Sequence, residues 1–158
     1  MNQNDTTVIK KLTPDNVEDY ISYLKKALAE EPEMMCTEEV KEEEIRKNVN
    51  NPLFGKSTSL LAYKDSEIVG RIEYHFYGCI QDAFKMAYVN WLYVMKKYRH
   101  RGIARQLFAE FEQDCKNCGI DQYFLFRAEN EGAEHFYRAF ENAELGNAPI
   151  LRKNIIMP

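Results

Sequence analysis

A strand-like run, a basic turn and a helix-like run follow one another between residues 86 and 118, and this junction constrains the fold more than any other part of the chain. Residues 86–94 are rich in aromatic and β-branched side chains, which is typical of a strand. After Gly102, apolar residues recur at spacings of three and four, which predicts one buried stripe on a helix that ends near Cys118. A strand must therefore lead directly into a helix N-terminus.

The turn between these two runs concentrates positive charge. Five basic side chains lie within ten residues, with no acid among them: Lys96, Lys97, Arg99, Arg101 and Arg105. The first turn of a helix presents N–H groups that have no helical acceptor, at the positive end of the macrodipole. Gly102 lacks the Cβ that would keep a ligand away from the backbone. The turn predicts a pyrophosphate site, and an ordinary basic helix start is the plainer alternative.

Length and composition limit the class of protein. A chain of 158 residues with 45% apolar and 29% charged residues predicts one globular domain over residues 1–158. No apolar run approaches the roughly 20 residues of a membrane span, and residues 1–5 do not begin a signal peptide. We therefore expect a cytoplasmic location and no membrane partner. The net charge of −4 disfavours a nucleic-acid partner.

The four cysteines show no disulfide framework. Cys115 and Cys118 stand two residues apart on the predicted helix, which is the spacing of half a zinc site. A structural zinc site needs about four ligands, and no second pair of Cys or His lies at suitable spacing. We therefore expect no metal and interpret these cysteines as packing residues.

Helical and strand-like periods alternate along the rest of the chain. The pattern predicts strands at 8–12, 59–64, 67–79, 86–94, 121–128 and 150–156, and helices at 14–30, 37–49, 102–118 and 130–140. The polar turn 64–67 predicts a hairpin. In its second strand, residues 68, 70, 72, 74 and 76 should share one face, and residues 69, 71, 73, 75 and 77 the other.

Two short motifs resemble those of a known family. Arg99, Gly102 and Ala104 form Arg-x-x-Gly-x-Ala after a strand end, which resembles the acyl-CoA signature of the GNAT superfamily of N-acyltransferases. The segment 130–137, Asn-x-x-Ala-x-x-Phe-Tyr, is similar to a second family segment. Over residues 8–156, the resemblance implies an α+β fold with three layers, in which a mixed, mostly antiparallel sheet carries helices on both faces.

The resemblance also implies how acetyl-CoA, the co-substrate, would bind. Backbone groups of Leu92, Tyr93 and Val94 would contact the pantetheine arm and the thioester. The Val94 N–H would be the main donor to the oxyanion. The residues implied to wrap the pyrophosphate are Arg99, His100, Arg101, Gly102, Ile103 and Ala104. Asn130 would contact CoA through its side chain.

The catalytic groups follow from the same resemblance and from proton chemistry. Tyr137 is our candidate general acid, because a phenol with a pKa near 10 is protonated at neutral pH and can give a proton to a departing thiolate. An ammonium acceptor must lose a proton, and the candidates to take it are Glu73, His75 and, through water, Asn90. Glu73 is preferred, with a solvated strand-face carboxylate as the alternative.

These residues predict an N-acetyltransferase that transfers an acetyl group directly to a primary amine, either a small cationic amine or a peptide amine. The acidic segment 30–39 favours a cationic acceptor, and solvated helix faces explain the same charges. The chain departs from the family pattern at Glu141-Asn142, where Gly-Phe is usual, and at Lys96, where Pro is frequent. The alternative is a catalytically weak or inactive module that binds or senses acyl-CoA. A homodimer is left open.

Overall fold

The computed structural model describes residues 6–156. The chain forms two compact units, Met1–Leu125 and Phe126–Pro158. Residues 1–5, on which the expectation of no signal peptide rests, lie outside the described residues, and a single domain over residues 1–158 stays a prediction. No helix within residues 6–156 has the length and apolar character needed to cross a bilayer. The cytoplasmic location also stays a prediction.

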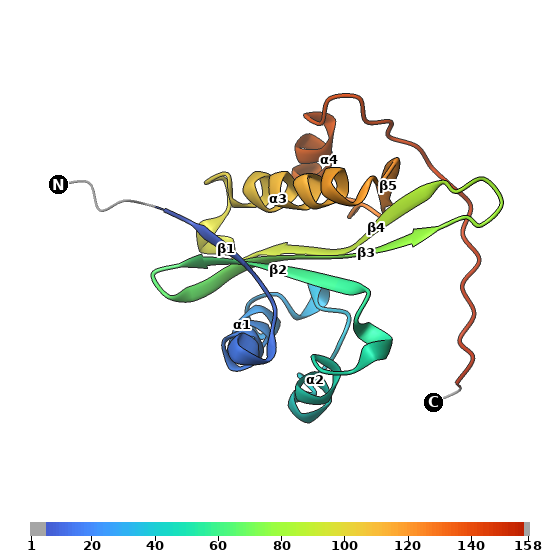
Figure 1. The fold of residues 1–158 in the computed structure, drawn as a ribbon. Helices are drawn as coiled ribbons and strands as arrows, with labels where there is room; N and C mark the ends of the chain where they lie inside the picture. The colour runs from blue at the N-terminus through green and yellow to red at the C-terminus, as the bar shows by residue number, and fades with distance from the viewer. Residues whose placement is uncertain (1–5, 157–158) are drawn as a thin grey trace. The chain divides into compact units, whose positions relative to one another are not determined.

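The larger unit is built on a five-stranded sheet with the strand order β1-β2-β3-β4-β5 (Figure 1). Its strands are β1 (Val8–Lys11), β2 (Ser57–Lys64), β3 (Glu67–Gly78), β4 (Lys85–Val94) and β5 (Gln122–Leu125). The first four strands pair antiparallel, and β5 pairs parallel with β4. The predicted mixed, mostly antiparallel sheet is confirmed, although β5 ends three residues earlier than its apolar run predicted.

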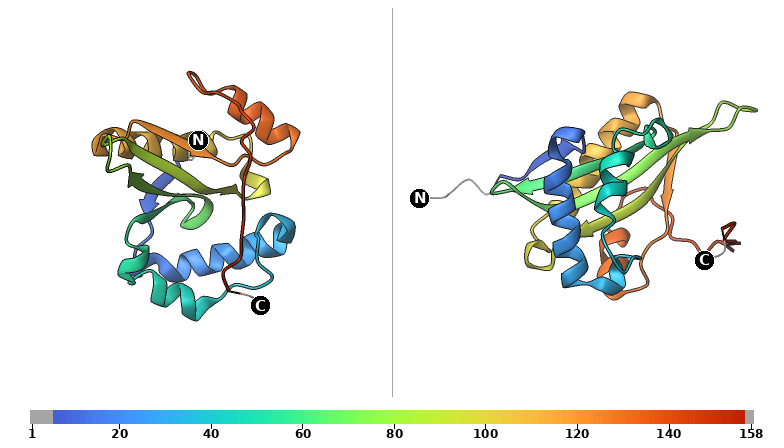
Figure 2. Two further views of the ribbon diagram at one scale, coloured as in Figure 1. Left: turned by 90° about the vertical axis from the view of Figure 1, so that its right-hand side faces the viewer. Right: turned by 90° about the horizontal axis from the view of Figure 1, so that it is seen from below.

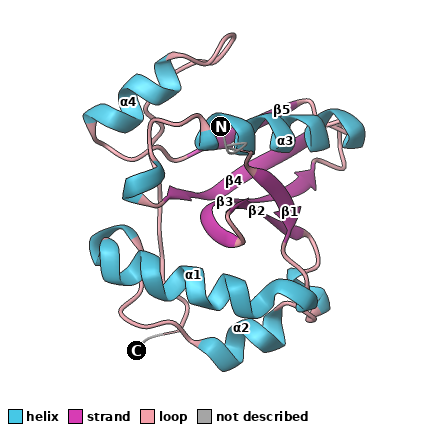
Figure 3. Cartoon of the chain, turned by 90° about the vertical axis from the view of Figure 1, so that its left-hand side faces the viewer, coloured by secondary structure: helices cyan, strands magenta, loops and turns pink. Residues whose placement is uncertain are grey.

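Helices cover both faces of this sheet. On one face lie α1 (Val17–Glu30) and α2 (Glu42–Asn48), and on the other lies α3 (Ile103–Cys118) (Figures 1 and 3). Seen from the face that they cover, α1 and α2 run side by side (Figure 2, right). An ion pair between Lys25 and Glu42 joins them. The three layers that the resemblance implied are therefore present in this unit.

Each face of the sheet has its own apolar core. On the α1 side, Tyr23 and Ala27 pack in one buried cluster with Leu61 of β2. On the α3 side, the ring centroids of Phe111 and Tyr74 lie 4.6 Å apart. The predicted stripe on α3 is buried at four positions, Ile103, Leu107, Phe111 and Cys115, whereas Cys118 is exposed.

The hairpin of β2 and β3 was predicted, but Ile68 was assigned to the wrong face of its second strand. Its two turn residues, Asp65 and Ser66, have φ of 48° and 68°, as the tight turns that match strand twist require. The pairing then shifts, because Ala62 faces Gly70 while Tyr63 faces Ile68, which leaves residue 69 as a bulge. Ile68 consequently packs in the α1-side core, since a slip of one residue moves a side chain to the opposite face.

The second helix begins later than its glutamates predicted. It starts at Glu42 rather than at residue 37. The Thr37 hydroxyl donates to the Glu39 carbonyl at 2.8 Å and lies 3.4 Å from the Glu39 N–H. Side chains of this type that bond to the nearby backbone stabilise turns instead of helix. The chain therefore turns at residues 37–39 before α2 begins.

Among residues 126–156, the described part of the smaller unit, there is one helix, α4 (Glu131–Arg138). The predicted strand at 150–156 is wrong, because these residues form no strand. Two apolar pairs there are separated by Arg, Lys and Asn, so the segment lacks the alternation that gives a strand one buried face. Leu151 and Ile156 are correspondingly 91% and 87% exposed.

Candidate active site

Near the end of β4, the backbone groups of alternate residues point toward β3 and away from it. The Met95 N–H donates to the Val69 carbonyl at 2.9 Å, so it faces β3. Because backbone groups of successive residues alternate between the two edges of a strand, the N–H groups of Val94 and Leu92 face away from β3. Tyr93 faces β3, and its carbonyl accepts a hydrogen bond from the Tyr23 hydroxyl at 3.0 Å.

The edge that carries the Leu92 and Val94 amides is the edge where β5 stops pairing. Parallel pairing between β4 and β5 runs from Met86 to Val89 and no further among the described residues. At the next residue the register of β4 against β3 shifts, which leaves Asn90 as a bulge. Bulges bend strands and commonly lie beside active sites. The backbone donors of Leu92 and Val94 therefore lie beyond this bulge, on an edge that β5 does not cover.

The basic turn ends at the helix N-terminus that the sequence predicted. His100 has φ of 59° and Gly102 has φ of 80°, and α3 begins at Ile103. The first helical hydrogen bond runs from the Gln106 N–H to the Gly102 carbonyl at 3.0 Å, so the amides of residues 103–105 have no acceptor within the helix. A Cβ on Gly102 would meet no atom within 4 Å. N–H groups that a helix leaves without acceptors are suited to bind a phosphate.

The basic side chains of the turn divide into two groups. Arg99 and Lys96 form ion pairs with Glu31, which follows α1. In contrast, Lys97 and Arg101 lie over the Tyr98 ring, with Lys97 Nζ and Arg101 Cζ at 4.8 and 5.9 Å from its centroid. The contact with Glu31 was not predicted from the sequence, where an acidic pair just before Pro32 is its signal.

A carboxylate on β3 is bound to the β4 bulge. Glu73 accepts hydrogen bonds from Ser59 Oγ at 2.9 Å and from Asn90 Nδ2 at 2.8 Å. Arg71 Nη1 lies 3.4 Å from the same carboxylate and also bonds to the Tyr20 hydroxyl. The structure thus brings together two of the predicted catalytic residues, Glu73 and Asn90.

These contacts determine the protonation of Glu73. Burial raises its pKa, but the charge of Arg71 and the hydrogen bonds from Asn90 and Ser59 outweigh burial and hold the pKa below its ordinary value. Glu73 is therefore an anion at neutral pH and a weaker base than an ordinary glutamate. Its role as general base stays a prediction. The other candidate, His75, packs its ring edge-on against Tyr88, with centroids 5.2 Å apart.

The smaller unit holds the other two predicted side chains. Asn130 caps α4, because its Oδ1 accepts the Ala133 N–H at 2.8 Å. Tyr137 packs against Phe136 and Phe140, with ring centroids 5.1 and 5.7 Å away. Burial raises the pKa of Tyr137 to about 12, so its phenol is protonated at neutral pH. A surface hollow beside it is lined by Tyr137, Arg138, Phe140, Ala143 and Leu145.

A sequence model of the acetyltransferase (GNAT) family matches residues 21–141, which contain the strand end, the basic turn and Tyr137. The chain belongs to this family of acetyltransferases. The resemblance that the two motifs suggested is thereby confirmed. No curated protein sequence shows significant similarity to the chain.

Solved structures share the fold of this GNAT protein at low sequence identity. An aminoglycoside acetyltransferase from an uncultured soil metagenomic sample, in complex with trehalose, has a TM-score of 0.79 at 19% identity, over 97% of this chain and 99% of that one. The aminoglycoside N-acetyltransferase AAC(6')-Iy in complex with CoA has 0.73 at 19%, over 97% and 98%. A ribosomal-protein-alanine N-acetyltransferase from Brucella melitensis biovar Abortus 2308 has 0.73 at 14%, over 94% and 100%.

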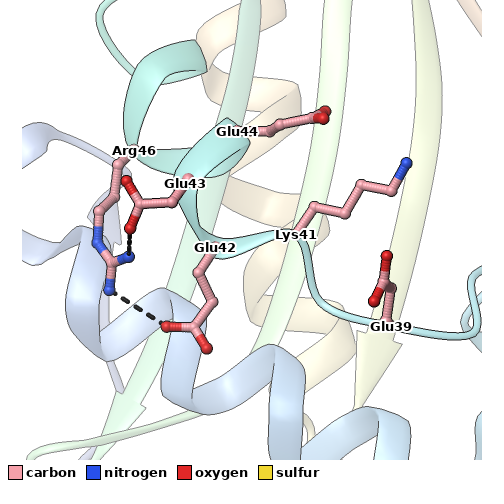
Figure 4. A pocket seen from close by; sticks show the side chains of 6 residues that line it. All are labelled: Glu39, Lys41, Glu42, Glu43, Glu44 and Arg46. Atoms are coloured by element: carbon pink, nitrogen blue, oxygen red, sulfur yellow. Dashed lines mark hydrogen bonds and ion pairs between the residues drawn. The ribbon is translucent and has the colours of Figure 1, made fainter.

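A second hollow of this GNAT chain lies at the start of α2 and is acidic (Figure 4). It is lined by Glu39, Lys41, Glu42, Glu43, Glu44 and Arg46. Arg46 Nη1 lies 2.7 Å from Glu43 and Arg46 Nη2 lies 3.2 Å from Glu42. Two of its four carboxylates are therefore paired within the protein, so this hollow offers less negative charge to a cationic ligand than its sequence suggests.

Within residues 6–156, no three His, Cys, Asp or Glu side chains gather as a metal site.

Proposed function

We propose that this protein transfers an acetyl group from acetyl-CoA directly to a primary amine, either a small cationic amine or a peptide amine. One observation carries the proposal: the backbone donors of Leu92 and Val94 lie on the open edge of β4, and that strand leads through a basic turn to the N-terminus of α3. A pantetheine arm along this edge and a pyrophosphate at Gly102 would occupy both sets of donors at once.

In this proposal the turn binds the coenzyme mainly through its backbone. The amides at Ile103 and Ala104 and the two preceding peptide groups would surround the pyrophosphate, while Arg101 supplies charge. His100 and Gly102 adopt left-handed conformations, and such residues let successive backbone amides form an anion-binding concavity. Asn130 would reach CoA through its amide nitrogen, since its oxygen caps α4.

The chemistry needs an oxyanion donor, an acid and a route for a proton. The Val94 N–H, beside that of Leu92, would stabilise the charge that develops on the thioester oxygen. Tyr137, protonated because its pKa is raised to about 12, would give its proton to the departing thiolate and be reprotonated by the second proton that the acetylated nitrogen loses. Glu73 would accept the ammonium proton, through a water held by Asn90, and its anionic form would first attract the cationic acceptor.

The solved structures support an amine acceptor, because those named above are acetyltransferases of aminoglycosides or of a ribosomal-protein alanine. A second candidate function is a module that binds acyl-CoA without turnover. The lowered pKa of Glu73 favours it, since a weaker base removes an ammonium proton less effectively.

The test is thiol release from acetyl-CoA across a panel of amines that includes an aminoglycoside, a polyamine and a lysine-containing peptide. We expect release with at least one amine, together with acetylated product detected by mass spectrometry. Calorimetry with CoA is the parallel measurement. Binding without release from any amine would replace the enzyme by the sensing module, and absence of CoA binding would contradict both.

A further inference from the structure

Glu31, the residue that follows α1, carries a buried carboxylate that the proposed chemistry does not use. Its side chain is 11% exposed. A carboxylate is rarely buried unless it is ion-paired and hydrogen-bonded, because it loses its hydration. The partners of Glu31 should therefore explain why it is there.

Those partners belong to the end of β4 and to the segment that links β4 to α3. Arg99 approaches Glu31 with both terminal nitrogens, Nη2 bonding to Oε2 and Nη1 at 3.4 Å from Oε1. The Tyr93 hydroxyl donates to Oε2 at 2.7 Å, and Lys96 Nζ lies 3.5 Å from Oε1. Burial pushes the pKa of Glu31 upward, but the hydrogen bonds from Arg99 and Tyr93 outweigh burial and keep the pKa below its ordinary value. Glu31 is thus ionised in the fold.

The contact with Arg99 reaches the candidate active site. Arg99 Nε donates to the Val94 carbonyl at 2.9 Å, and the guanidinium carbon lies 5.3 Å from the centroid of the Tyr93 ring. One side chain therefore joins the end of α1 to the strand edge that carries the Val94 amide. The Nε, Nη1 and Nη2 atoms of Arg99 each donate to an acceptor within the protein.

The preceding residue reinforces the same connection. Glu30 Oε2 accepts the backbone N–H of Lys96 at 2.9 Å and lies 2.9 Å from the Tyr93 hydroxyl. The two acids at the end of α1 thus contact residues 93, 96 and 99. The part of the turn that follows Arg99 lies beyond these contacts. This is the stretch whose left-handed residues lead into α3.

We propose that Glu31 is a positioning residue for the coenzyme A site. Its carboxylate fixes the Arg99 side chain, which in turn links the end of α1 to the Val94 carbonyl. This inference rests on the proposed function. The Arg99 side chain supports the turn, and Arg101 with the amides before α3 meets the phosphates.

The first experiment compares Glu31→Gln with Glu110→Gln, which removes the same charge from an exposed position on α3. Calorimetry with CoA alone measures the dissociation constant. We expect about tenfold weaker binding for Glu31→Gln, the equivalent of one lost charge-assisted contact, and no change for Glu110→Gln. The double variant Glu31→Gln/Arg99→Gln should bind no more weakly than Arg99→Gln alone, because the two residues act as a unit.

The second experiment distinguishes a positioning role of Arg99 from direct binding of Arg99 to the phosphates. It does not depend on the folding of Glu31→Gln. The salt dependence of CoA affinity reports charge contacts with the phosphates. Arg99→Gln should weaken binding and keep the wild-type salt dependence, whereas Arg101→Gln should flatten it.

Three results would overturn the inference while leaving the proposed function intact: equal affinities for Glu31→Gln and Glu110→Gln, tighter binding by Glu31→Gln, or a flattened salt dependence for Arg99→Gln. Tighter binding would mean that a released Arg99 reaches the phosphates. Failure of the wild-type protein to bind CoA would instead remove the proposed function, and this inference with it.

Discussion

The two ends of α3 provide a matched test of the proposed pyrophosphate site, because a glycine in the left-handed region stands at each end. Gly102 precedes the helix with φ of 80°, and Gly119 follows it with φ of 64°. An L-residue in this conformation is disfavoured by about 1–2 kcal/mol. The variants Gly102→Ala and Gly119→Ala therefore introduce the same backbone strain at opposite ends of one helix.

Neither added methyl group clashes with the protein. A Cβ at residue 102 meets no atom within 4 Å, and a Cβ at residue 119 meets only Lys85 Nζ at 3.6 Å, an ordinary contact. Each variant should therefore lose about 1–2 kcal/mol of unfolding free energy from strain alone, which lowers the melting temperature by about 2–8 °C for a chain of this size. Thermal unfolding followed by circular dichroism measures this loss.

Ligand binding should separate the two variants. The methyl group at residue 102 would fill the space in front of the first amides of α3, where the pyrophosphate must approach. We expect the dissociation constant for CoA to rise at least about tenfold in Gly102→Ala, or about 1.4 kcal/mol, and to stay within about twofold in Gly119→Ala. If calorimetry finds equal CoA affinities for the two variants, the phosphates do not bind at this helix end.

Three further predictions concern charge and proton transfer. Tyr137→Phe should lower kcat about 100-fold or more for an identified acceptor while CoA affinity is retained, and unchanged turnover would rule out the general acid. Arg101→Glu should weaken CoA binding and flatten its salt dependence; calorimetry at two salt concentrations checks this, and Arg152→Glu is the control for net charge. Because the folded pKa of Glu73 is lowered, its stabilising contribution is present above the ordinary value near 4.5 and is lost as the pH falls through the folded pKa. Glu73→Gln should therefore lose less stability than wild type between pH 7 and pH 3 in thermal melts, and parallel losses would contradict the ion pair with Arg71.

Local signals predicted the elements that surround the site. The apolar period of three and four residues found α3, and Gly119 marked its end, because these features depend on neighbours along the chain. The motif containing Gly102 correctly predicted an open helix N-terminus after β4. The two-residue turn at Asp65 and Ser66 likewise follows from its polar sequence.

Features that depend on distant partners were not predictable from single segments. The face of Ile68 depends on a bulge at residue 69, and the register of a strand pair is a property of both strands. The partner of Arg99 is Glu31, 68 residues earlier in the chain. Ile150 and its neighbours had strand-like composition, but strand formation needs a partner edge and an alternating face.

The open edge of β4 also bears on how the molecule meets other copies of itself. Exposed backbone donors and acceptors on a strand can recruit a foreign strand, and proteins usually protect them. Within the described residues, pairing with β5 stops at Val89, and Arg99 Nε donates to the Val94 carbonyl beyond that point. A pantetheine arm bound along this edge would cover its unpaired backbone groups and block pairing with another chain. The tendency of the purified protein to self-associate should therefore fall when CoA is added.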